Sequence, residues 1–470
     1  MPTYTFSRRS RIASPAAALF EWHKRPGAFE RLSPPWEKVR VLERSGGIGP
    51  GDRLVVLVPV APLVHSRWTV EHRDYIEGRQ FRDVQLRGPF AHWVHTHRVE
   101  PEGPNASVLD DSIEYRLPLG PLGARFGAPL VCAKLERLFR YRHAVTAADL
   151  TRHQQFADRA ALRVAITGST GLIGSALVPF LTAGGHAVRR LVRPRSSASA
   201  RGTPPASGVG ETVHWDPDRG QLDPEALEGV DAVVHLAGES VSERWTAEHK
   251  RAILESRIRG TGLLAQTLAQ LRRPPQVFVS VSAVGFYGDG GQRLLDESSP
   301  PGSDFLAHVA QQWEAAARPA AERGIRVVHP RFGVVLSPAG GALGRLLPVF
   351  KLYGGGKLGS GNQWMSWVAL DDVVGAIHHL LFTESLAGPV NVVAPNPVTN
   401  ETFGKTLGHV LHRPAAMAVP GFAVRAMFGE MAEVMLLAGQ RLTPRRLLES
   451  GFQFRHPHLE EALRFELGRE

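Results

Sequence analysis

Residues 164–174 constrain the fold more than any other part of the sequence. Val164-Ala165-Ile166-Thr167 is an apolar run typical of a buried strand. It passes directly into a turn with glycine at positions 168, 171 and 174, and a helical pattern follows. The first glycine permits a tight turn, the second admits another group close to the backbone, and the third lets the helix pack against the strand. This order predicts the opening unit of a parallel, doubly wound α/β sheet.

The same turn is a candidate dinucleotide site. Backbone N–H groups in such a turn and the positive end of the following helix attract a pyrophosphate. The strand, the glycine turn and the helix occur here in the order that this use requires. The residues that we expect to contact the cofactor are Gly168, Ser169, Thr170, Gly171, Leu172, Ile173 and Gly174.

Strand and helix patterns alternate after residue 163, as in a Rossmann sheet. The predicted elements are 163–167, 175–183, 187–192, 231–236, 248–271, 276–282, 305–321 and 327–336. A stretch rich in Ser, Ala, Pro and Gly, 196–210, is expected to be a loop.

The first 150 residues have a different pattern, which predicts an antiparallel meander closed by a long helix. A strand opens the chain, a short helix starts near Pro15, and the long helix is predicted over 129–147. The expected strands of the meander are 38–43, 53–60, 65–72, 80–88, 91–100 and 107–116.

This order resembles the helix-grip fold of the START and polyketide cyclase/dehydrase superfamily, also called SRPBCC. The resemblance implies a cavity between sheet and helix that binds a hydrophobic small molecule. The alternative is that the aromatic residues simply fill a core. Those residues are Trp68, Tyr75, Phe81, Phe90 and Trp93.

A chain of 470 residues is too long for one ordinary core. We expect a helix-grip domain over 1–150, a polar linker over 151–162, a Rossmann domain over 163–415 and a helical module over 416–470. Within that module, one helix is predicted over 422–439.

Composition excludes several classes of protein. No apolar run approaches the ~18 residues of a membrane span, and Cys132 is the sole cysteine, so we expect a cytoplasmic protein without disulfides. The net charge of +10 comes from arginines spread along the chain, so no nucleic-acid partner is expected. No metal site is predicted.

The end of the second Rossmann strand indicates which dinucleotide binds. An acidic residue there would hydrogen-bond the ribose of NAD, but residues 186–195 contain none. Arg193 instead follows the strand directly and can pair with the 2′-phosphate of NADP. We therefore expect NADP rather than NAD. Of Arg189 and Arg190, at least one should point away from the cofactor, because strand side chains alternate.

These motifs resemble the extended short-chain dehydrogenase/reductases, and within them the atypical "epimerase family protein" group. The glycine turn matches the superfamily's motif. Further matches to the group are His214-Trp215-Asp216-Pro217, Ser282-Ala283-Val284-Gly285-Phe286-Tyr287-Gly288 and Gln363-Trp364-Met365-Ser366-Trp367. The resemblance places Leu236, Ala237 and Gly238 beside the adenosine, and it implies that the C-terminal module is the group's module of unknown function.

The resemblance also implies catalytic residues. Ser282 matches the serine that orients the substrate. The helix that should carry Tyr-x-x-x-Lys, 304–314, contains neither residue, so Tyr287 or His308 is a candidate proton donor in their place. Arg331 matches the loop that faces the nicotinamide, where it either binds an anion or forms a structural ion pair. Asp371-Asp372 resembles a pair that caps a helix.

Three functions remain open. The first is an NADP-dependent, epimerase-like oxidoreductase that acts on a small-molecule substrate and carries a hydrophobic-ligand domain. The second is a non-catalytic NADP(H) sensor or scaffold, in which the absence of the Tyr/Lys pair means that the protein catalyses no reaction. The third is a transport or binding protein dominated by its first domain.

Overall fold

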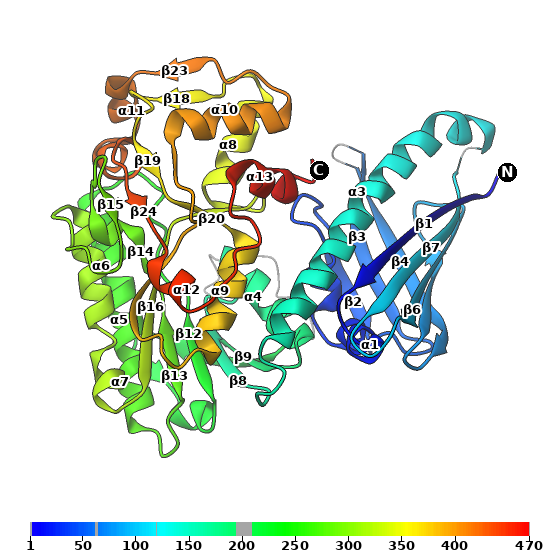
Figure 1. The fold of residues 1–470 in the computed structure, drawn as a ribbon, viewed down its shortest axis with the longest axis horizontal. Coiled ribbons are helices and arrows are strands. Elements are labelled where there is room, and N and C mark those ends of the chain that lie inside the picture. Colours follow the sequence, from blue (N-terminus) through cyan, green and yellow to red (C-terminus); the bar gives the residue numbers. More distant parts are fainter. Residues whose placement is uncertain (1, 62–63, 119, 194–208, 470) are drawn as a thin grey trace.

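The computed structural model describes residues 2–61, 64–118, 120–193 and 209–469 (Figure 1). Most of the stretch expected to be a loop, 196–210, lies outside these residues. An antiparallel sheet with a long helix forms the N-terminal domain, and a parallel sheet covered by helices forms the second domain. The predicted fold class, a helix-grip domain followed by a Rossmann domain, is confirmed.

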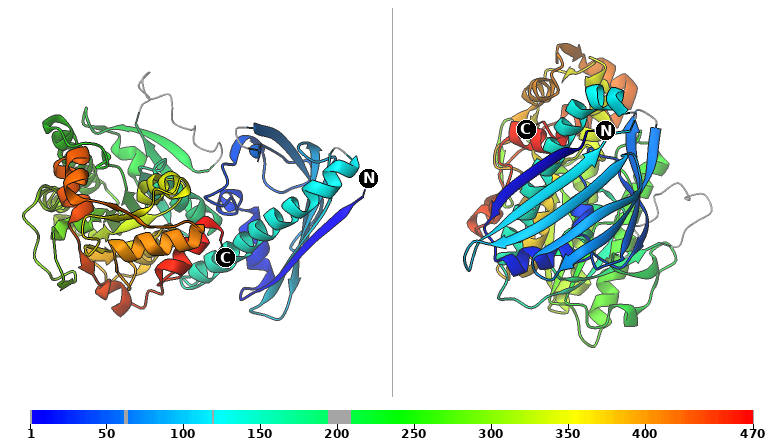
Figure 2. Two further views of the ribbon diagram at one scale, coloured as in Figure 1. Left: turned by 90° about the horizontal axis from the view of Figure 1, so that it is seen from above. Right: turned by 90° about the vertical axis from the view of Figure 1, so that its right-hand side faces the viewer.

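The N-terminal domain is built on a seven-stranded sheet with the order β1-β7-β6-β5-β4-β3-β2. Its elements are β1 (Tyr4–Ile12), α1 (Ala16–Lys24), α2 (Ala28–Arg31), β2 (Arg40–Ser45), β3 (Arg53–Ala61), β4 (Val64–Ile76), β5 (Gln80–Arg87), β6 (His92–Pro101), β7 (Ser107–Arg116) and α3 (Gly120–Gln154). Strand β1 pairs with β7, so the first and last strands lie side by side. Figure 2 shows that α3 lies between this sheet and the second domain.

Helix α3 holds the N-terminal domain together. Its Leu135 and Phe139 are buried against Trp93 and Ile113 of the sheet. The helix extends beyond both ends of the predicted range, 129–147. The helix continues into the polar residues that follow this range, where Arg152 donates to Asp372 and His153 stacks on Phe180 of the second domain.

The second domain has a mainly parallel sheet with the order β11-β10-β9-β8-β12-β13-β16-β14, and β21 also pairs with β16. The strands are β8 (Arg163–Thr167), β9 (Ala187–Val192), β10 (Glu211–Asp216), β11 (Gln221–Leu222), β12 (Ala232–His235), β13 (Val277–Ser280), β14 (Ser282–Ala283), β16 (Arg326–Phe332) and β21 (Gly388–Val392). The strand order reverses between β8 and β12. Sheets of this kind bind ligands at such a reversal, beyond the carboxyl ends of the strands.

Helices cover both faces of this sheet, and a smaller C-terminal layer lies over one end (Figure 1). The helices are α4 (Leu172–Ala183), α5 (Ala247–Gln270), α6 (Phe305–Ala315), α7 (Arg318–Glu322), α8 (Gly341–Lys351), α9 (Leu370–Phe382), α10 (Asn400–Leu411), α11 (Gly421–Phe428), α12 (Arg445–Glu449) and α13 (Leu459–Leu467). The short strands are β15 (Leu294–Leu295), β17 (Val334–Leu336), β18 (Gly356–Leu358), β19 (Trp364–Met365), β20 (Trp367–Ala369), β22 (Val398–Thr399), β23 (Met417–Val419) and β24 (Arg441–Leu442).

Two helices predicted as continuous are interrupted. The range 305–321 forms α6 and α7, because Pro319 lacks the N–H that would continue a single helix and lies instead in the first turn of α7. The range 422–439 forms α11 and a π-helical turn, Ala432–Leu437. Gly429, with a φ of 62°, ends α11.

Buried ion pairs join the two domains. Arg31 of α2 donates to Asp149 of α3 and also to Asp371 of α9, with N···O distances of 2.6–2.7 Å. Arg152 reaches Asp372 at 2.7 Å. Asp371 and Asp372 lie in the first turn of α9, whose N-cap residue is Ala369. The pair thus lies where a helix opens and has a structural role, as expected, but its carboxylates do not cap α9: they bind arginines from across the domain junction instead.

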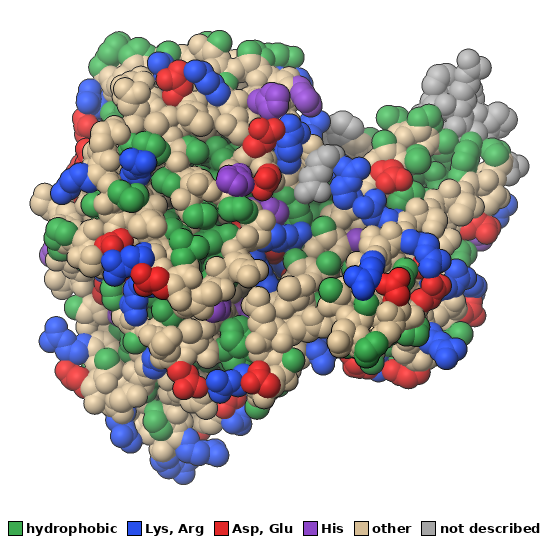
Figure 3. All heavy atoms as spheres, in the orientation of Figure 1, with side chains coloured by type: hydrophobic (Ala, Val, Ile, Leu, Met, Phe, Trp, Pro, Cys, Tyr) green, Lys and Arg blue, Asp and Glu red, His purple; other side chains and the backbone are tan. Residues whose placement is uncertain are grey.

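Charged side chains of both signs share the surface. On the face shown in Figure 3, acidic side chains are interspersed among lysines and arginines. None of the helices in the described ranges is long and apolar enough to cross a membrane.

Candidate functional site

The glycine turn between β8 and α4 is tightly packed. Gly168 has a φ of 64°, and a Cβ there would lie 2.8 Å from the carbonyl carbon of Leu236. A Cβ on Gly174 would lie 2.3 Å from the Gly168 oxygen. These two positions therefore exclude side chains, as expected for a turn that brings a helix N-terminus close to a strand end.

Thr167 and His235 fix the neighbouring loop. The Thr167 Oγ1 atom accepts hydrogen bonds from the backbone of Leu236 at 3.1 Å and Ala237 at 3.3 Å. Its own proton then goes to His235 Nδ1, 2.7 Å away. Burial and, to a smaller extent, the nearby charge of Arg257 lower the pKa of His235 to about 3. The ring is therefore neutral, and its Nδ1 atom can accept this hydrogen bond. The loop predicted to lie beside the adenosine, 236–238, is thereby held against the glycine turn.

One side chain of the turn has an unused polar atom. Ser169 is buried, and its hydroxyl makes no hydrogen bond with the residues that the structure describes. A buried hydroxyl without a partner is costly unless a ligand supplies one. The donor set of this turn, a hydroxyl beside the N-terminus of α4, fits a phosphate oxygen.

The three arginines of strand β9 and its end differ in their surroundings. Arg189 donates to Glu211 at 2.9 Å and to the Ala226 carbonyl. Arg190 is buried and donates to Thr212 at 3.2 Å. Arg193 follows β9, is exposed, and has no partner among the described residues. Among these three, Arg193 is the guanidinium available to a ligand.

Ser282, Tyr287 and Arg331 are brought together by Glu314, a residue that the sequence analysis did not select. Ser282 donates to Glu314 Oε1 at 2.7 Å. Arg331 donates to both oxygens of Glu314 at 2.8 Å and to the Tyr287 hydroxyl at 2.9 Å. Tyr287 in turn donates to Asn391 Oδ1 at 2.8 Å. We call these five residues the Glu314 network.

The charges in the Glu314 network follow from its burial. Burial raises the pKa of Tyr287, so its hydroxyl stays protonated and donates to Asn391. Burial alone would lower the pKa of Arg331, but the ion pair with Glu314 raises it. Arg331 also lies over the Phe286 ring, 3.4 Å from the ring centroid. Of the two roles expected for Arg331, the ion pair is the one observed.

One of the predicted catalytic residues lies outside the Glu314 network. His308 lies on the exposed face of α6 and does not join the network. Glu314 and Asn391 were missed because each is separated from its partners by many residues of sequence. Glu314 carried one usable signal: it is the carboxylate on the helix where the superfamily's Tyr and Lys are absent.

An open cleft of about 550 Å³ lies at the opposite, amino end of the sheet. Its lining includes Arg25, Arg163, His186 and Glu228. Because doubly wound sheets bind dinucleotides beyond the carboxyl ends of their strands, this cleft is not the candidate cofactor site.

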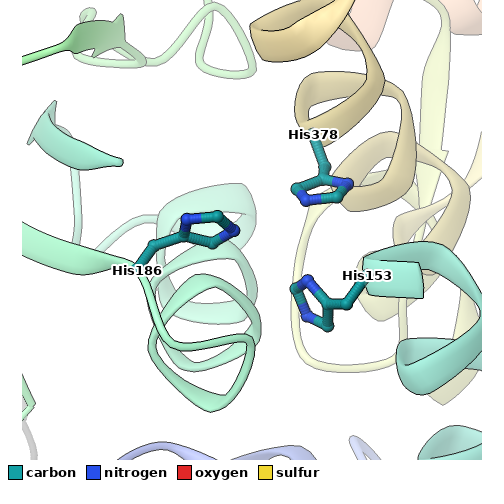
Figure 4. Close-up of side chains that lie close together, drawn as sticks. All are labelled: His153, His186 and His378. Carbon is teal, nitrogen blue, oxygen red and sulfur yellow. The ribbon is translucent and has the colours of Figure 1, made fainter. Parts of the chain in front are cut away.

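Three histidines converge at the domain junction (Figure 4): His153 from α3, His186 before β9 and His378 from α9. Their donor nitrogens lie within 4.8 Å of one another. Burial lowers the pKa of His153 to about 3 and that of His186 to about 4, and it also lowers the pKa of His378. His186 Nδ1 accepts a hydrogen bond from the Leu162 N–H at 3.1 Å, so its proton is on Nε2. We call these three residues the junction histidines.

Three known families match consecutive parts of the chain. "Polyketide cyclase / dehydrase and lipid transport" matches residues 3–148, "NAD dependent epimerase/dehydratase family" matches 164–393, and a domain of unknown function matches 419–466. An epimerase family protein of Mycobacterium bovis is 44% identical over 301 residues, which are 64% of this chain and 96% of that protein. The human epimerase family protein SDR39U1 is 37% identical over 64% of this chain and 99% of its own length.

The solved structures that are similar include one from a bacterium and one from human. A nucleoside-diphosphate sugar epimerase from Corynebacterium glutamicum has a TM-score of 0.80 at 32% identity, covering 99% of this chain and 90% of that one. Human SDR39U1, solved with NADPH, has a TM-score of 0.58 at 35% identity, covering 65% of this chain and 99% of that one. The bacterial structure thus matches both domains, and the human structure matches about two thirds of the chain.

Proposed function

Because the chain belongs to the NAD-dependent epimerase/dehydratase family, we propose that it is an epimerase-like oxidoreductase that binds NADP(H) at the glycine turn and acts on a small-molecule substrate. The observation that carries the proposal is the tightly packed turn with the unpartnered hydroxyl of Ser169. Arg193, which has no partner among the described residues, follows the neighbouring parallel strand β9.

The cofactor contacts follow from these positions. Residues 168–174 cradle the pyrophosphate at the N-terminus of α4, and residues 236–238 lie beside the adenosine. Arg193 pairs with the 2′-phosphate, which favours NADP over NAD. The NADPH in the human relative's structure supports this preference.

Ser282 is the proposed contact to the substrate oxygen. Bound nicotinamide supplies or accepts a hydride. Ser282 lies at the carboxyl end of the sheet, and its proton is held by Glu314 Oε1. The Ser282–Glu314 pair thus offers a path for a proton where the usual Tyr and Lys are missing.

Tyr287 and Arg331 are proposed as positioning residues. The Tyr287 hydroxyl already donates to Asn391 and accepts from Arg331, and the Arg331 guanidinium already binds Glu314. Both side chains are buried. They hold the carboxylate of Glu314 in place behind Ser282.

The substrate and the first domain's ligand are proposed by class. The name of the similar bacterial structure makes nucleoside-diphosphate sugars the first compounds to screen. The N-terminal domain is proposed to bind a hydrophobic small molecule, supported by its match to a family that includes lipid transport. Mass spectrometry of an organic extract of the purified protein tests for that ligand.

A titration with NADPH and NADH tests the cofactor proposal. Energy transfer from tryptophan to bound nicotinamide reports binding. Arg193→Ala should weaken NADPH binding about 10- to 100-fold, as for loss of one charge-assisted hydrogen bond, and leave NADH binding unchanged. Arg189→Ala is the matched control, because Arg189 already has protein partners. Equal effects of the two substitutions would refute the assignment of Arg193.

A second function, a non-catalytic NADP(H) sensor, is favoured by the saturated hydrogen bonds of Tyr287 and Arg331. In that case, cofactor binding would change the arrangement of the domains. We propose that the segment 151–162 separates them, and limited proteolysis there with and without NADPH tests the idea. An identical cleavage pattern would argue against a sensor.

A further inference from the structure

Histidine and aspartate side chains lie inside the N-terminal domain, where the sequence suggested only an apolar interior. Cross-strand register places His72 of β4 opposite Asp83 of β5, and Asp83 opposite His95 of β6. His97 of β6 lies opposite Asp111 of β7. Because alternate residues of a strand share a face, His95 and His97 point to the same side of the sheet.

Neither carboxylate in this group forms an ion pair with a lysine or an arginine of the described ranges. Asp111 is 3% exposed, and Asp83 retains 20% of its side-chain exposure. Among the described residues, only histidines lie within ion-pair distance of Asp83 or Asp111. Two buried negative charges require compensation. Burial would lower the pKa of His97, but Asp111 and Asp83 raise it to about 9, so a proton on His97 supplies part of the compensation in the metal-free chain. A divalent cation would displace that proton and balance both carboxylates.

Three donor atoms face one another, and the one hydrogen bond recorded between them among the described residues, His97 Nε2 to Asp83 Oδ2, is long at 3.4 Å. His95 Nε2 donates to Asp111 Oδ1 at 2.9 Å, so the lone pair of neutral His95 is on Nδ1. That nitrogen lies 3.7 Å from Asp83 Oδ2. His97 Nε2 lies 3.4 Å from the same oxygen, and the three residues' donors all lie within 4.8 Å of one another. Ligands bound tetrahedrally at about 2.0–2.1 Å are separated by about 3.3 Å, close to these distances.

Asp111 is placed as an outer support for two of these donors. Its Oδ1 atom accepts from His95 Nε2 and lies 2.6 Å from His97 Nδ1. Its Oδ2 atom binds His143 Nε2 of α3 at 2.7 Å. Metal-ligating histidines characteristically direct their second nitrogen at a carboxylate in this way.

We propose that His95 Nδ1, His97 Nε2 and the Asp83 carboxylate bind a divalent first-row transition metal ion inside the N-terminal domain. Two imidazoles favour Zn²⁺, Fe²⁺ or Co²⁺ over Mg²⁺ and Ca²⁺, which prefer oxygen donors. Three protein donors leave a position for water or for an oxygen atom of a bound molecule.

The junction histidines are a poorer site for the same ion. The charged side chains that influence the pKa values of His153 and His378 most are arginines, Arg25, Arg31 and Arg152, which would repel a cation. The proton that His186 carries on Nε2 also blocks that nitrogen as a donor.

Metal binding by the untagged, full-length protein tests the proposal. Chelator-treated protein is titrated with Co²⁺, followed by visible absorption, and the Zn²⁺ content after reconstitution is measured by mass spectrometry. Asp83→Asn removes a ligand, and Asp111→Asn removes the outer support. Asp110→Asn, on the same strand, is the matched control, because Asp110 lies near Arg9 and Arg98 instead. Circular dichroism confirms that each variant is folded.

We expect about one Co²⁺ per chain in the unmodified protein and in Asp110→Asn, no binding in Asp83→Asn, and affinity reduced about 10- to 100-fold in Asp111→Asn. A folded, unmodified protein that takes up neither Co²⁺ nor Zn²⁺ would overturn the proposal, as would binding that survives Asp83→Asn. Should Asp83→Asn fail to fold, X-ray absorption of the Zn²⁺-loaded protein decides. Two imidazoles with oxygen donors support the site, and three imidazoles would assign the metal to the junction histidines instead.

Discussion

Replacing Arg31 by methionine tests whether the buried ion pairs hold the two domains together. The substitution keeps most of the side-chain length and removes three hydrogen bonds of 2.6–2.7 Å. Asp371 would keep its bond to Arg455 at 2.7 Å, but Asp149, which is fully buried, would lose its only described ion-pair partner. Breaking a buried pair from one side typically costs about 3–5 kcal/mol, so we expect a loss of this size in the free energy of unfolding.

The loss should depend on pH in a defined direction. Burial raises the pKa of Asp149 even with Arg31 present, and without Arg31 it should rise further. A carboxyl whose folded pKa exceeds its unfolded value binds a proton more readily in the folded state, so the variant regains stability as the pH falls.

Urea unfolding of Arg31→Met, followed by tryptophan fluorescence at pH 8 and pH 5, measures both effects. Asp149→Asn added to Arg31→Met should restore part of the loss at pH 8, because the unpaired charge is gone. A loss below about 1 kcal/mol that does not change with pH would refute the reasoning.

Three further predictions concern the turn, the network and the junction. Gly174→Ala should abolish NADPH binding, since its Cβ would lie 2.3 Å from the Gly168 oxygen, whereas Gly262→Ala, with nothing within 4 Å, should leave binding intact. Ser282→Ala should lower turnover of any substrate found by screening about 10²- to 10⁴-fold, with Ser280→Ala as the control. Burial holds the pKa of His153 at about 3, below the ordinary value of about 6.5. The unfolded chain therefore binds more protons as the pH falls below about 6.5, and stability decreases. His153→Phe should remove about 1–2 kcal/mol of the loss of unfolding free energy between pH 7.5 and 5, and an unchanged loss would contradict the prediction.

Local patterns made much of the fold predictable. The glycine turn follows from backbone geometry within one segment, and the strands of both sheets follow from runs of apolar or alternating residues. The helix range 305–321 was predicted as one piece because apolar spacing continues across Pro319, while the proline itself ends the hydrogen-bond ladder.

The sites were less predictable because they join distant segments. Glu314 became significant only when the fold placed it between Ser282 and Arg331. The spacing of His95 and His97 on one strand was a usable signal, but Asp83 reaches them only through the pairing of β5 with β6. The sequence alone made Asp371 resemble a helix cap. Its actual partner, Arg31, lies in the other domain and could not be identified from the sequence.

A crystal structure of the protein with NADPH tests the central claim most directly. The account predicts the pyrophosphate at the N-terminus of α4, the 2′-phosphate beside Arg193 and the nicotinamide directed toward Ser282. NADPH bound in the cleft at the amino end of the sheet, or a glycine turn left empty at saturating NADPH, would contradict it.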